Sequence, residues 1–300
     1  MGHEVHAVDH KVQARLDRLR FNEFFLSIVK HGAYDLVVIV THRDEFIPEI
    51  LDEARRYSIL MAWNCDDNWK WENYSSRWAP HYTYMVTTYR HIYNANKLKY
   101  PNLLLSQWGC TGISEGLEVA KDIDISFVGV CYGKRHHQIE TLRKRFQLVA
   151  YGKGIMRESS LPKKLQKSLA HLFRIPYIER NSTLPNQASL KGIWNRSKIS
   201  FTPLEGSEGD KLQIKGRVFD MGLSGTVMIC NKNQDLYEFY EPAKEFVEFE
   251  NMGECVSKVK YLLRNEKERR AIAGAYYKRT KNEHLWSHRF AKLFLEMGLK

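Results

Sequence analysis

Residues 211–230 read Lys211-Leu-Gln-Ile-Lys-Gly-Arg-Val-Phe-Asp220 and then Met221-Gly-Leu-Ser-Gly-Thr-Val-Met-Ile-Cys230. This order predicts a short basic helix, a turn of small residues and a buried strand. It is typical of a site where a phosphorylated ligand lies beside a parallel sheet. Lys215 and Arg217 supply positive charge, and Gly216 lets the backbone approach a phosphate closely. The stretch therefore predicts a phosphate-binding segment in an α/β domain.

Two alternating series of predicted elements flank a glycine-containing linker at 107–116. Each series alternates apolar runs of strand length with runs of helical period, which is typical of a doubly wound α/β domain. In the first series we expect strands at 35–40, 58–63, 84–87 and 102–105, and helices at 12–32, 45–57 and 88–98. In the second we expect strands at 124–130, 147–151, 176–178 and 198–203, and helices at 134–146, 162–173 and 186–195.

Three charged amphipathic helices are expected in the last segment, residues 253–300. The domain prediction is therefore a first domain at 1–112, a second at 113–280, and a C-terminal helix at 281–300 that packs back on the first domain.

Composition narrows the class of protein. With 300 residues and 43% apolar content, the chain is long enough for two packed domains. It has no apolar run of the ~20 residues that span a bilayer, and its first nine residues carry charge where a signal peptide is apolar. We therefore expect a cytoplasmic protein without a transmembrane segment. The five cysteines form no Cys-x-x-Cys pair, which disfavours a disulfide framework and a structural zinc site.

The net charge of +11 predicts an acidic partner, and nucleotide phosphates, a nucleic acid and peripheral contact with an anionic surface all remain open. Lysine and arginine are dispersed along helices rather than gathered in a tail, which makes nucleic-acid binding the weaker alternative. The chain has neither Gly-x-Gly-x-x-Gly nor a P-loop motif, so a dinucleotide dehydrogenase and a P-loop ATPase are disfavoured.

Several motifs accompany the opening stretch. They are Ser126-Phe-Val-Gly129, Gly133-Lys-Arg135, Trp194–Pro203 and Tyr240–Phe249. Together with Lys215–Asp220 they resemble the donor-site half of the spore-maturation (CgeB-like) glycosyltransferases, within the glycosyl transferases group 1 superfamily. The resemblance covers residues 122–289 and, more loosely, 59–109. It implies the GT-B fold, in which two Rossmann-like domains face each other across a cleft.

The same resemblance implies the reaction. A nucleoside diphosphate sugar would be the donor, bound mainly by the C-terminal domain, and an unknown glycan, protein or small molecule would be the acceptor. Cationic side chains would stabilise the leaving diphosphate, so neither a metal ion nor another cofactor is expected. Asp220 or Gln213 would bind the ribose, and Tyr177 lies where a strand end would contact the base. The expected donor-binding residues are Gly133, Lys134, Arg135, Tyr177, Gln213, Lys215, Gly216, Arg217 and Asp220.

Two carboxylates end a predicted strand of the first domain, in Ile59-Leu-Met-Ala-Trp-Asn-Cys-Asp-Asp67. Because the carboxyl edge of a parallel sheet forms the ligand crevice, Asp66 or Asp67 is a candidate base that deprotonates the acceptor of an inverting enzyme. The alternative is that the pair caps the next helix. An aromatic-rich acidic loop follows, whose rings either stack on sugars or form a buried cluster.

Relatives of this type usually open with a strand and a phosphate turn before the segment that here reads Gly2–Asp9. The sequence therefore predicts a first domain without its usual first strand. A catalytically impaired nucleotide-sugar-binding or structural relative remains an alternative for this reason.

Overall fold

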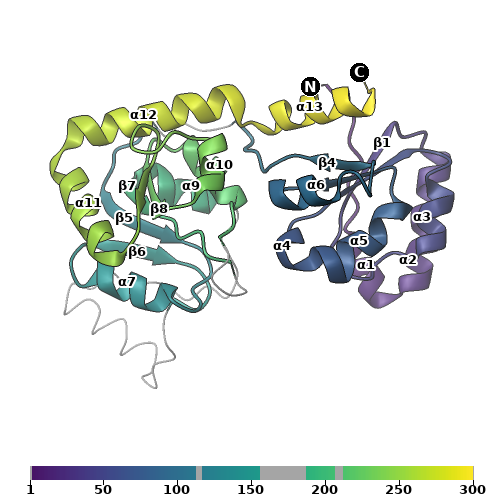
Figure 1. The fold of residues 1–300 in the computed structure, drawn as a ribbon, viewed down its shortest axis with the longest axis horizontal. Coiled ribbons are helices and arrows are strands. Elements are labelled where there is room, and N and C mark those ends of the chain that lie inside the picture. The colour runs from purple at the N-terminus through teal and green to yellow at the C-terminus, as the bar shows by residue number, and fades with distance from the viewer. Residues whose placement is uncertain (1, 113–116, 156–186, 207–211, 300) are drawn as a thin grey trace. The chain divides into compact units, whose positions relative to one another are not determined.

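A computed structural model describes residues 2–112, 117–155, 187–206 and 212–299 (Figure 1). The chain divides into two compact units, one formed by Met1–Trp108 with Arg289–Lys300 and the other by Gly109–His288. The predicted helix at 162–173 and the predicted strand at 176–178 lie outside the described residues.

The first unit contains a parallel sheet in the order β1-β2-β3-β4. Its strands are β1 (Leu36–Val40), β2 (Ile59–Trp63), β3 (Tyr84–Thr87) and β4 (Leu103–Leu105). Its helices include α1 (His10–Leu16), α2 (Arg18–His31), α3 (Pro48–Ala54), α6 (Arg90–Asn96) and α13 (Trp286–Met297). The four strands fall where the sequence predicts them.

The first predicted helix is broken at Asp17, so the prediction of one continuous helix was wrong. Asp17 is extended, with φ −154° and ψ 102°, and its side chain accepts a hydrogen bond from the backbone N–H of Arg20. An aspartate that caps a new helix in this way competes with continuation of the preceding one.

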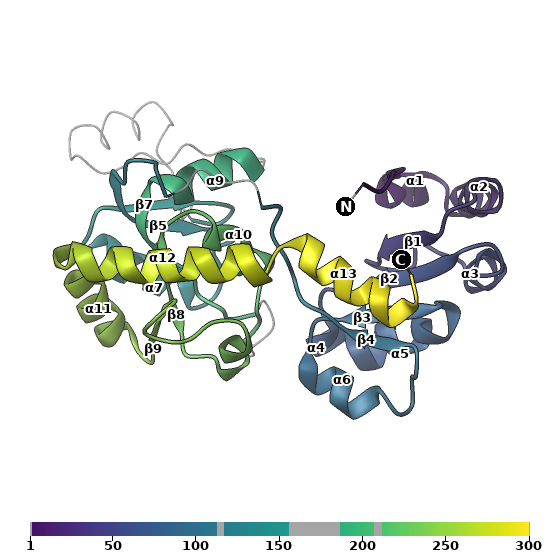
Figure 2. The ribbon, with the colours of Figure 1, turned by 90° about the horizontal axis from the view of Figure 1, so that it is seen from above.

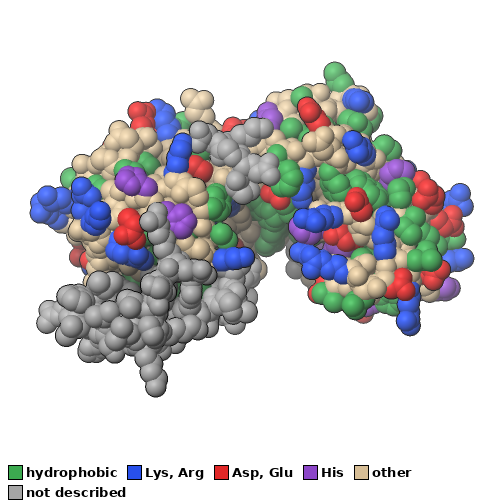
Figure 3. All heavy atoms as spheres, turned by 90° about the horizontal axis from the view of Figure 1, so that it is seen from below, with side chains coloured by type: hydrophobic (Ala, Val, Ile, Leu, Met, Phe, Trp, Pro, Cys, Tyr) green, Lys and Arg blue, Asp and Glu red, His purple; other side chains and the backbone are tan. Residues whose placement is uncertain are grey.

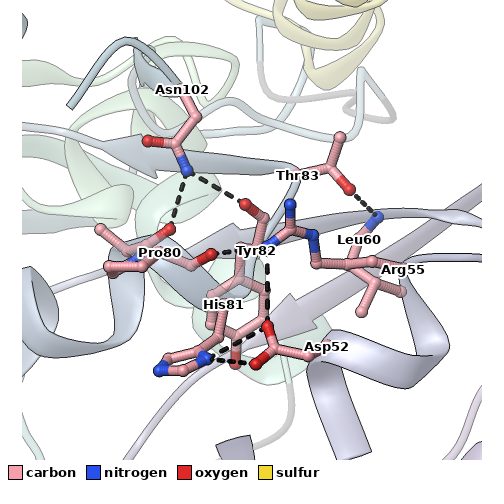
Figure 4. Close-up of polar contacts among 9 residues, drawn as sticks. Asp52, Arg55, Leu60, Pro80, His81, Tyr82, Thr83 and Asn102 are labelled. Carbon is pink, nitrogen blue, oxygen red and sulfur yellow. Dashed lines mark hydrogen bonds and ion pairs between the residues drawn. The ribbon is translucent and has the colours of Figure 1, made fainter. Parts of the chain in front are cut away.

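The predicted aromatic loop is instead helical. It consists of α4 (Asp67–Lys70), a π-helical turn (Trp71–Ser75), α5 (Ser76–Trp78) and a 3-10 turn (Ala79–His81). Figure 4 shows how polar contacts attach the end of this segment to its neighbours. The Asn102 amide donates to the backbone oxygens of Ala79 (2.8 Å) and Tyr82 (3.0 Å), and His81 Nδ1 lies 3.1 Å from Asp52 Oδ2. These contacts come from distant parts of the sequence, so the local pattern could not reveal them.

The first sheet is covered on one face and partly covered on the other, where Val38 and Val40 of β1 are 41% and 50% exposed. On one face Leu60, Ala62 and Met85 pack in a cluster with Phe21 of α2 and Leu51 of α3. Met61 and Trp63 of β2, whose side chains point to the other face, are also buried. The Trp63 ring lies 6.3 Å from that of Phe290 in α13, and Leu293 of the same helix is buried. The end of α13 is therefore part of this unit's core.

The described residues of the second unit form a parallel sheet in the order β6-β5-β7-β8-β9. The strands are β5 (Ile123–Val128), β6 (Leu148–Tyr151), β7 (Ser197–Phe201), β8 (Val227–Asn231) and β9 (Val247–Phe249). Among the described residues of this unit, the α-helices are α7 (Arg135–Arg143), α9 (Gln187–Arg196), α10 (Gly216–Gly222), α11 (Met252–Arg264) and α12 (Glu266–Glu283), seen from a second direction in Figure 2. The chain leaves β5 for β6 on one side and later returns to β7 on the other. This reversal is a topological switch point, where doubly wound sheets bind ligands.

Helix α10, which holds the opening stretch of the sequence, is fixed closely against α12. A Cβ atom added at Gly222 would lie 2.1 Å from Thr280 Oγ1, so only glycine permits this approach. The buried Tyr276 of α12 donates a hydrogen bond to the backbone oxygen of Val218. The position of α10 relative to the sheet is therefore determined by α12.

The predicted fold class, two parallel α/β domains, is confirmed. All five cysteines are free thiols. Within the described ranges, no helix is both long and apolar enough to cross a bilayer. On the face seen in Figure 3, the described lysine and arginine side chains are interspersed with acidic and hydrophobic ones.

Candidate functional site

The loops after β5 and β7 meet at the switch point of the second sheet, and side chains from α10 join them. The loop after β5 begins at Gly129, which has φ +151°. A Cβ atom there would lie 2.0 Å from Nη1 of Arg217. Glycine at this position therefore leaves the space that the Arg217 guanidinium occupies beside the strand end.

Arg217 donates a hydrogen bond to the backbone oxygen of Val128, the last residue of β5. Burial lowers its pKa to about 10, and the charge of Arg135 acts in the same direction. The residue nevertheless keeps part of its surface accessible to solvent. A guanidinium that is desolvated and close to a second one favours the approach of an anion.

Lys215 links the two loops. Its ammonium group donates to the backbone oxygen of Glu205, at 2.7 Å, and to the hydroxyl of Tyr132, at 3.2 Å. The Tyr132 hydroxyl also donates to the Glu205 oxygen, at 3.0 Å. A carbonyl oxygen and a phenol hydroxyl are both neutral hydrogen-bond partners.

Arg135 occupies a different position from the one its sequence suggested. Its side chain is only 1% exposed, and the guanidinium donates to the backbone oxygens of Val130 (2.8 Å) and Glu205 (2.6 Å). It also lies 4.0 Å above the ring of Tyr132, and burial lowers its pKa. Arg135 therefore joins the two loops from the inside.

The remaining predicted donor residues are dispersed around this cluster. Gly133 has φ +53° in the turn before α7, and Lys134 is exposed beside it. The backbone N–H of Gln213 donates to the oxygen of Leu204, and Gly216 begins α10. Tyr177 lies outside the described residues.

Asp220 lies on α10, one turn beyond the cations. Burial raises its pKa to about 6, and the positive charge of Lys191 on α9 opposes that shift. At neutral pH the carboxylate is ionised, which a hydrogen bond from a ligand hydroxyl would favour.

Sequence reasoning missed the residues that organise the loops, namely Tyr132, Gln138 and Glu205. Gln138 Nε2 donates to Glu205 Oε1 at 3.0 Å, so a side chain of α7 holds the loop after β7. Two features of the sequence could have pointed to these residues. Tyr132 stands directly before Gly133, and Glu205 follows the strand predicted at 198–203.

In the first unit, the two candidate carboxylates have different environments. Asp67 is fully buried and accepts a hydrogen bond from the hydroxyl of Ser75, at 2.5 Å. Burial raises its pKa, while the hydroxyls of Ser75 and Thr87 act to lower it. The Asp66 side chain is 37% exposed, and its Oδ2 lies 3.9 Å from Lys70 Nζ. Asp66 occupies the N-cap position of α4 without a capping side-chain hydrogen bond. Of these two carboxylates, Asp66 is the one that reaches solvent.

No histidine, cysteine and carboxylate cluster suited to a metal ion occurs among the described side chains. The candidate site is therefore a group of cations, Arg135, Lys215 and Arg217, held by two loops at the switch point of a parallel sheet.

Comparisons with known proteins identify the family and the fold of this chain. A family model described as glycosyl transferase-like matches residues 135–295, just over half of the chain. A search of curated proteins found no match.

Among solved structures, a glycosyltransferase from Rickettsia africae superposes with a TM-score of 0.60 at 14% identity, over 98% of this chain and 83% of that one. Sucrose-phosphate synthase from Thermosynechococcus elongatus gives 0.57 at 12% identity, over 95% and 80%. HepE from Anabaena, solved in complex with UDP-glucose, gives 0.57 at 11% identity, over 94% and 83%. At such identities the likeness establishes the fold, which is the predicted GT-B fold.

Proposed function

We propose that this protein transfers a sugar from a nucleoside diphosphate sugar to an acceptor, because the chain belongs to the glycosyl transferase-like family. The observation that carries this proposal is the cluster of Arg135, Lys215 and Arg217 at the switch point of the second sheet. A diphosphate is the anion that such a cluster at a sheet edge suits best.

In the proposed reaction, the bond between the anomeric carbon and the diphosphate oxygen breaks while the acceptor oxygen bonds to that carbon. Negative charge therefore grows on the leaving diphosphate. Lys215, the N-cap residue of α10, and Arg217 in its first turn would stabilise this charge, because the site is partly withdrawn from water. Since these groups supply the charge, we propose that no metal ion is required.

We propose that Arg135 positions the loops instead of contacting the phosphates. Its guanidinium is buried among backbone oxygens, so it holds Glu205 and Val130 where Lys215 and the turn at Gly133 need them. Lys134, exposed in that turn, is then a proposed phosphate contact. Asp220 and Gln213 remain the proposed ribose contacts.

On the acceptor side, we propose Asp66 as the base that removes the proton of the attacking hydroxyl. Unlike Asp67, it reaches solvent. The buried Asp67, bonded to Ser75, would instead keep α4 attached to the end of β2.

The base of the donor is proposed to be uracil, because HepE was solved with UDP-glucose. We also propose that the protein is of the CgeB-like subtype, because its residue pattern from Lys215 to Thr226 resembles that subtype.

The experiment is a panel of nucleoside diphosphate sugars, tested for thermal stabilisation and for release of free sugar, with and without EDTA. A uridine donor that stabilises the protein and is hydrolysed equally in EDTA supports the whole proposal. Stabilisation without hydrolysis or transfer would leave a nucleotide-sugar-binding protein, and hydrolysis abolished by EDTA would refute metal independence.

A further inference from the structure

A surface groove of about 540 Å³ lies on the second unit, between the end of α7 and one side of α11. These two helices are neighbours in Figures 1 and 2. Its lining is Arg145, Phe146, Val256, Lys260, Leu263 and Arg264. None of these residues belongs to the candidate donor site.

The apolar part of the groove arises because α11 has a wider apolar stripe than the core needs. Cys255, Val259 and Leu262 are buried in the core of the unit. Val256 and Leu263 lie on the adjacent stripe, two turns apart, and are only partly buried. Figures 1 and 2 place this helix beside α7, whose last turn is followed by Phe146.

The charged part of the groove consists of Arg145, Lys260 and Arg264, which are all exposed. Arg145 donates to the backbone oxygen of Thr141 at 3.1 Å. Among the residues that the structure describes, Lys260 and Arg264 have no hydrogen-bond or ion-pair partner, and no carboxylate lines the groove.

Neighbouring cations on the same helices do find carboxylates. Lys258 pairs with Glu254 at 2.7 Å, and Arg143 pairs with Glu140 at 2.9 Å. The groove therefore concentrates positive charge beside a partly buried apolar floor.

The chemistry of the lining selects the ligand. A free phosphate would use the cations and leave the floor exposed to water, whereas a neutral hydrocarbon would leave the cations unused. A stable protein interface involves roughly 20–30 residues on each side, and this groove offers the six named above. Its volume falls in the range of small-molecule sites, roughly 300–1,000 Å³.

We propose that this groove binds an acidic phospholipid, with an acyl chain on Phe146, Val256 and Leu263 and the anionic headgroup among the three cations. Lysine and arginine side chains are attracted to the negative charge of an acidic lipid surface. The net charge of +11 would also draw the protein towards such a surface.

The test uses dihexanoyl phosphatidylglycerol as a monomeric probe, titrated calorimetrically into the full chain. We expect saturable binding that is at least about tenfold tighter than that of dihexanoyl phosphatidylcholine or sn-glycerol 3-phosphate. The double variant Lys260→Glu with Arg264→Glu should lose this binding. The matched control, Lys278→Glu with Lys281→Glu on α12, makes the same charge change outside the groove and should retain it.

The apolar floor is tested separately with Leu263→Gln, which should weaken the lipid and leave glycerol phosphate unchanged. If the groove double variant does not fold, as judged by its melting temperature, Lys260→Gln with Arg264→Gln replaces it. Vesicles of phosphatidylcholine, with or without phosphatidylglycerol, then test the membrane as the source of the lipid. Equal binding of glycerol phosphate, equal binding of phosphatidylcholine, equal loss in the control variant, or no retention on acidic vesicles would each overturn the proposal.

Discussion

Arg217→Ala tests the donor site most directly. If its guanidinium contacts the diphosphate, the variant loses a charge-assisted hydrogen bond in a partly dry site, which costs about 1.5–3 kcal/mol. The dissociation constant of UDP should therefore rise by roughly ten- to a hundredfold.

The assay is thermal unfolding with and without UDP. At a ligand concentration a hundredfold above the wild-type dissociation constant, binding stabilises the native protein by about 2.7 kcal/mol, and by only about 0.4–1.4 kcal/mol in the variant at the same concentration. For a unit of this size, 1 kcal/mol corresponds to about 2–4 °C. The wild-type shift of roughly 5–11 °C should therefore fall by half or more.

The free variant also loses the hydrogen bond to Val128, so its melting temperature without ligand should fall slightly and only the ligand-induced shift is compared. The matched control is Arg196→Ala, which removes an exposed arginine that pairs with Asp122 in the same unit. It should retain the full UDP shift. The same UDP shift in Arg217→Ala and wild type would refute the assigned contact, and no shift with any nucleoside diphosphate would refute the donor site.

Three further changes test the surrounding assignments. Asp67→Ala should lower the free energy of unfolding in urea by about 1–3 kcal/mol, because buried hydroxyls lose their hydrogen-bond partner. Asp66→Asn should keep the stability of the wild type and lose sugar transfer. A stable Asp67 variant together with an unstable but active Asp66 variant would contradict both roles. Because the pKa of Asp220 is raised to about 6 in the folded protein, the wild type should lose stability relative to Asp220→Asn as the pH rises from about 4 to 6. The free energies of unfolding of the two proteins are compared over this pH range, and the same pH dependence in both would count against the raised pKa. Gly129→Ala should weaken UDP binding, since its Cβ meets Arg217 and its backbone is strained by about 1–3 kcal/mol, and unchanged affinity in calorimetry would contradict that contact.

The sequence by itself determined the two α/β units and the segment that forms the candidate donor site. Hydrophobic period distinguishes buried strands from amphipathic helices without tertiary information, which is why the described strands lie close to their predicted positions. The pattern from Lys215 to Asp220 identified the basic helix because charge, glycine and the following apolar run are all local features.

Which of the cations are buried depends on the tertiary structure. Arg135 and Lys215 look alike in sequence, but Arg135 is buried against Glu205, 70 positions away, while Lys215 remains partly exposed. Likewise Asp66 and Asp67 are adjacent in sequence, but Asp67 is fully buried and bonded to Ser75, whereas the Asp66 side chain is 37% exposed. Such differences depend on desolvation and hydrogen bonds between segments that are distant in the chain, and periodicity within a short window carries no information about either.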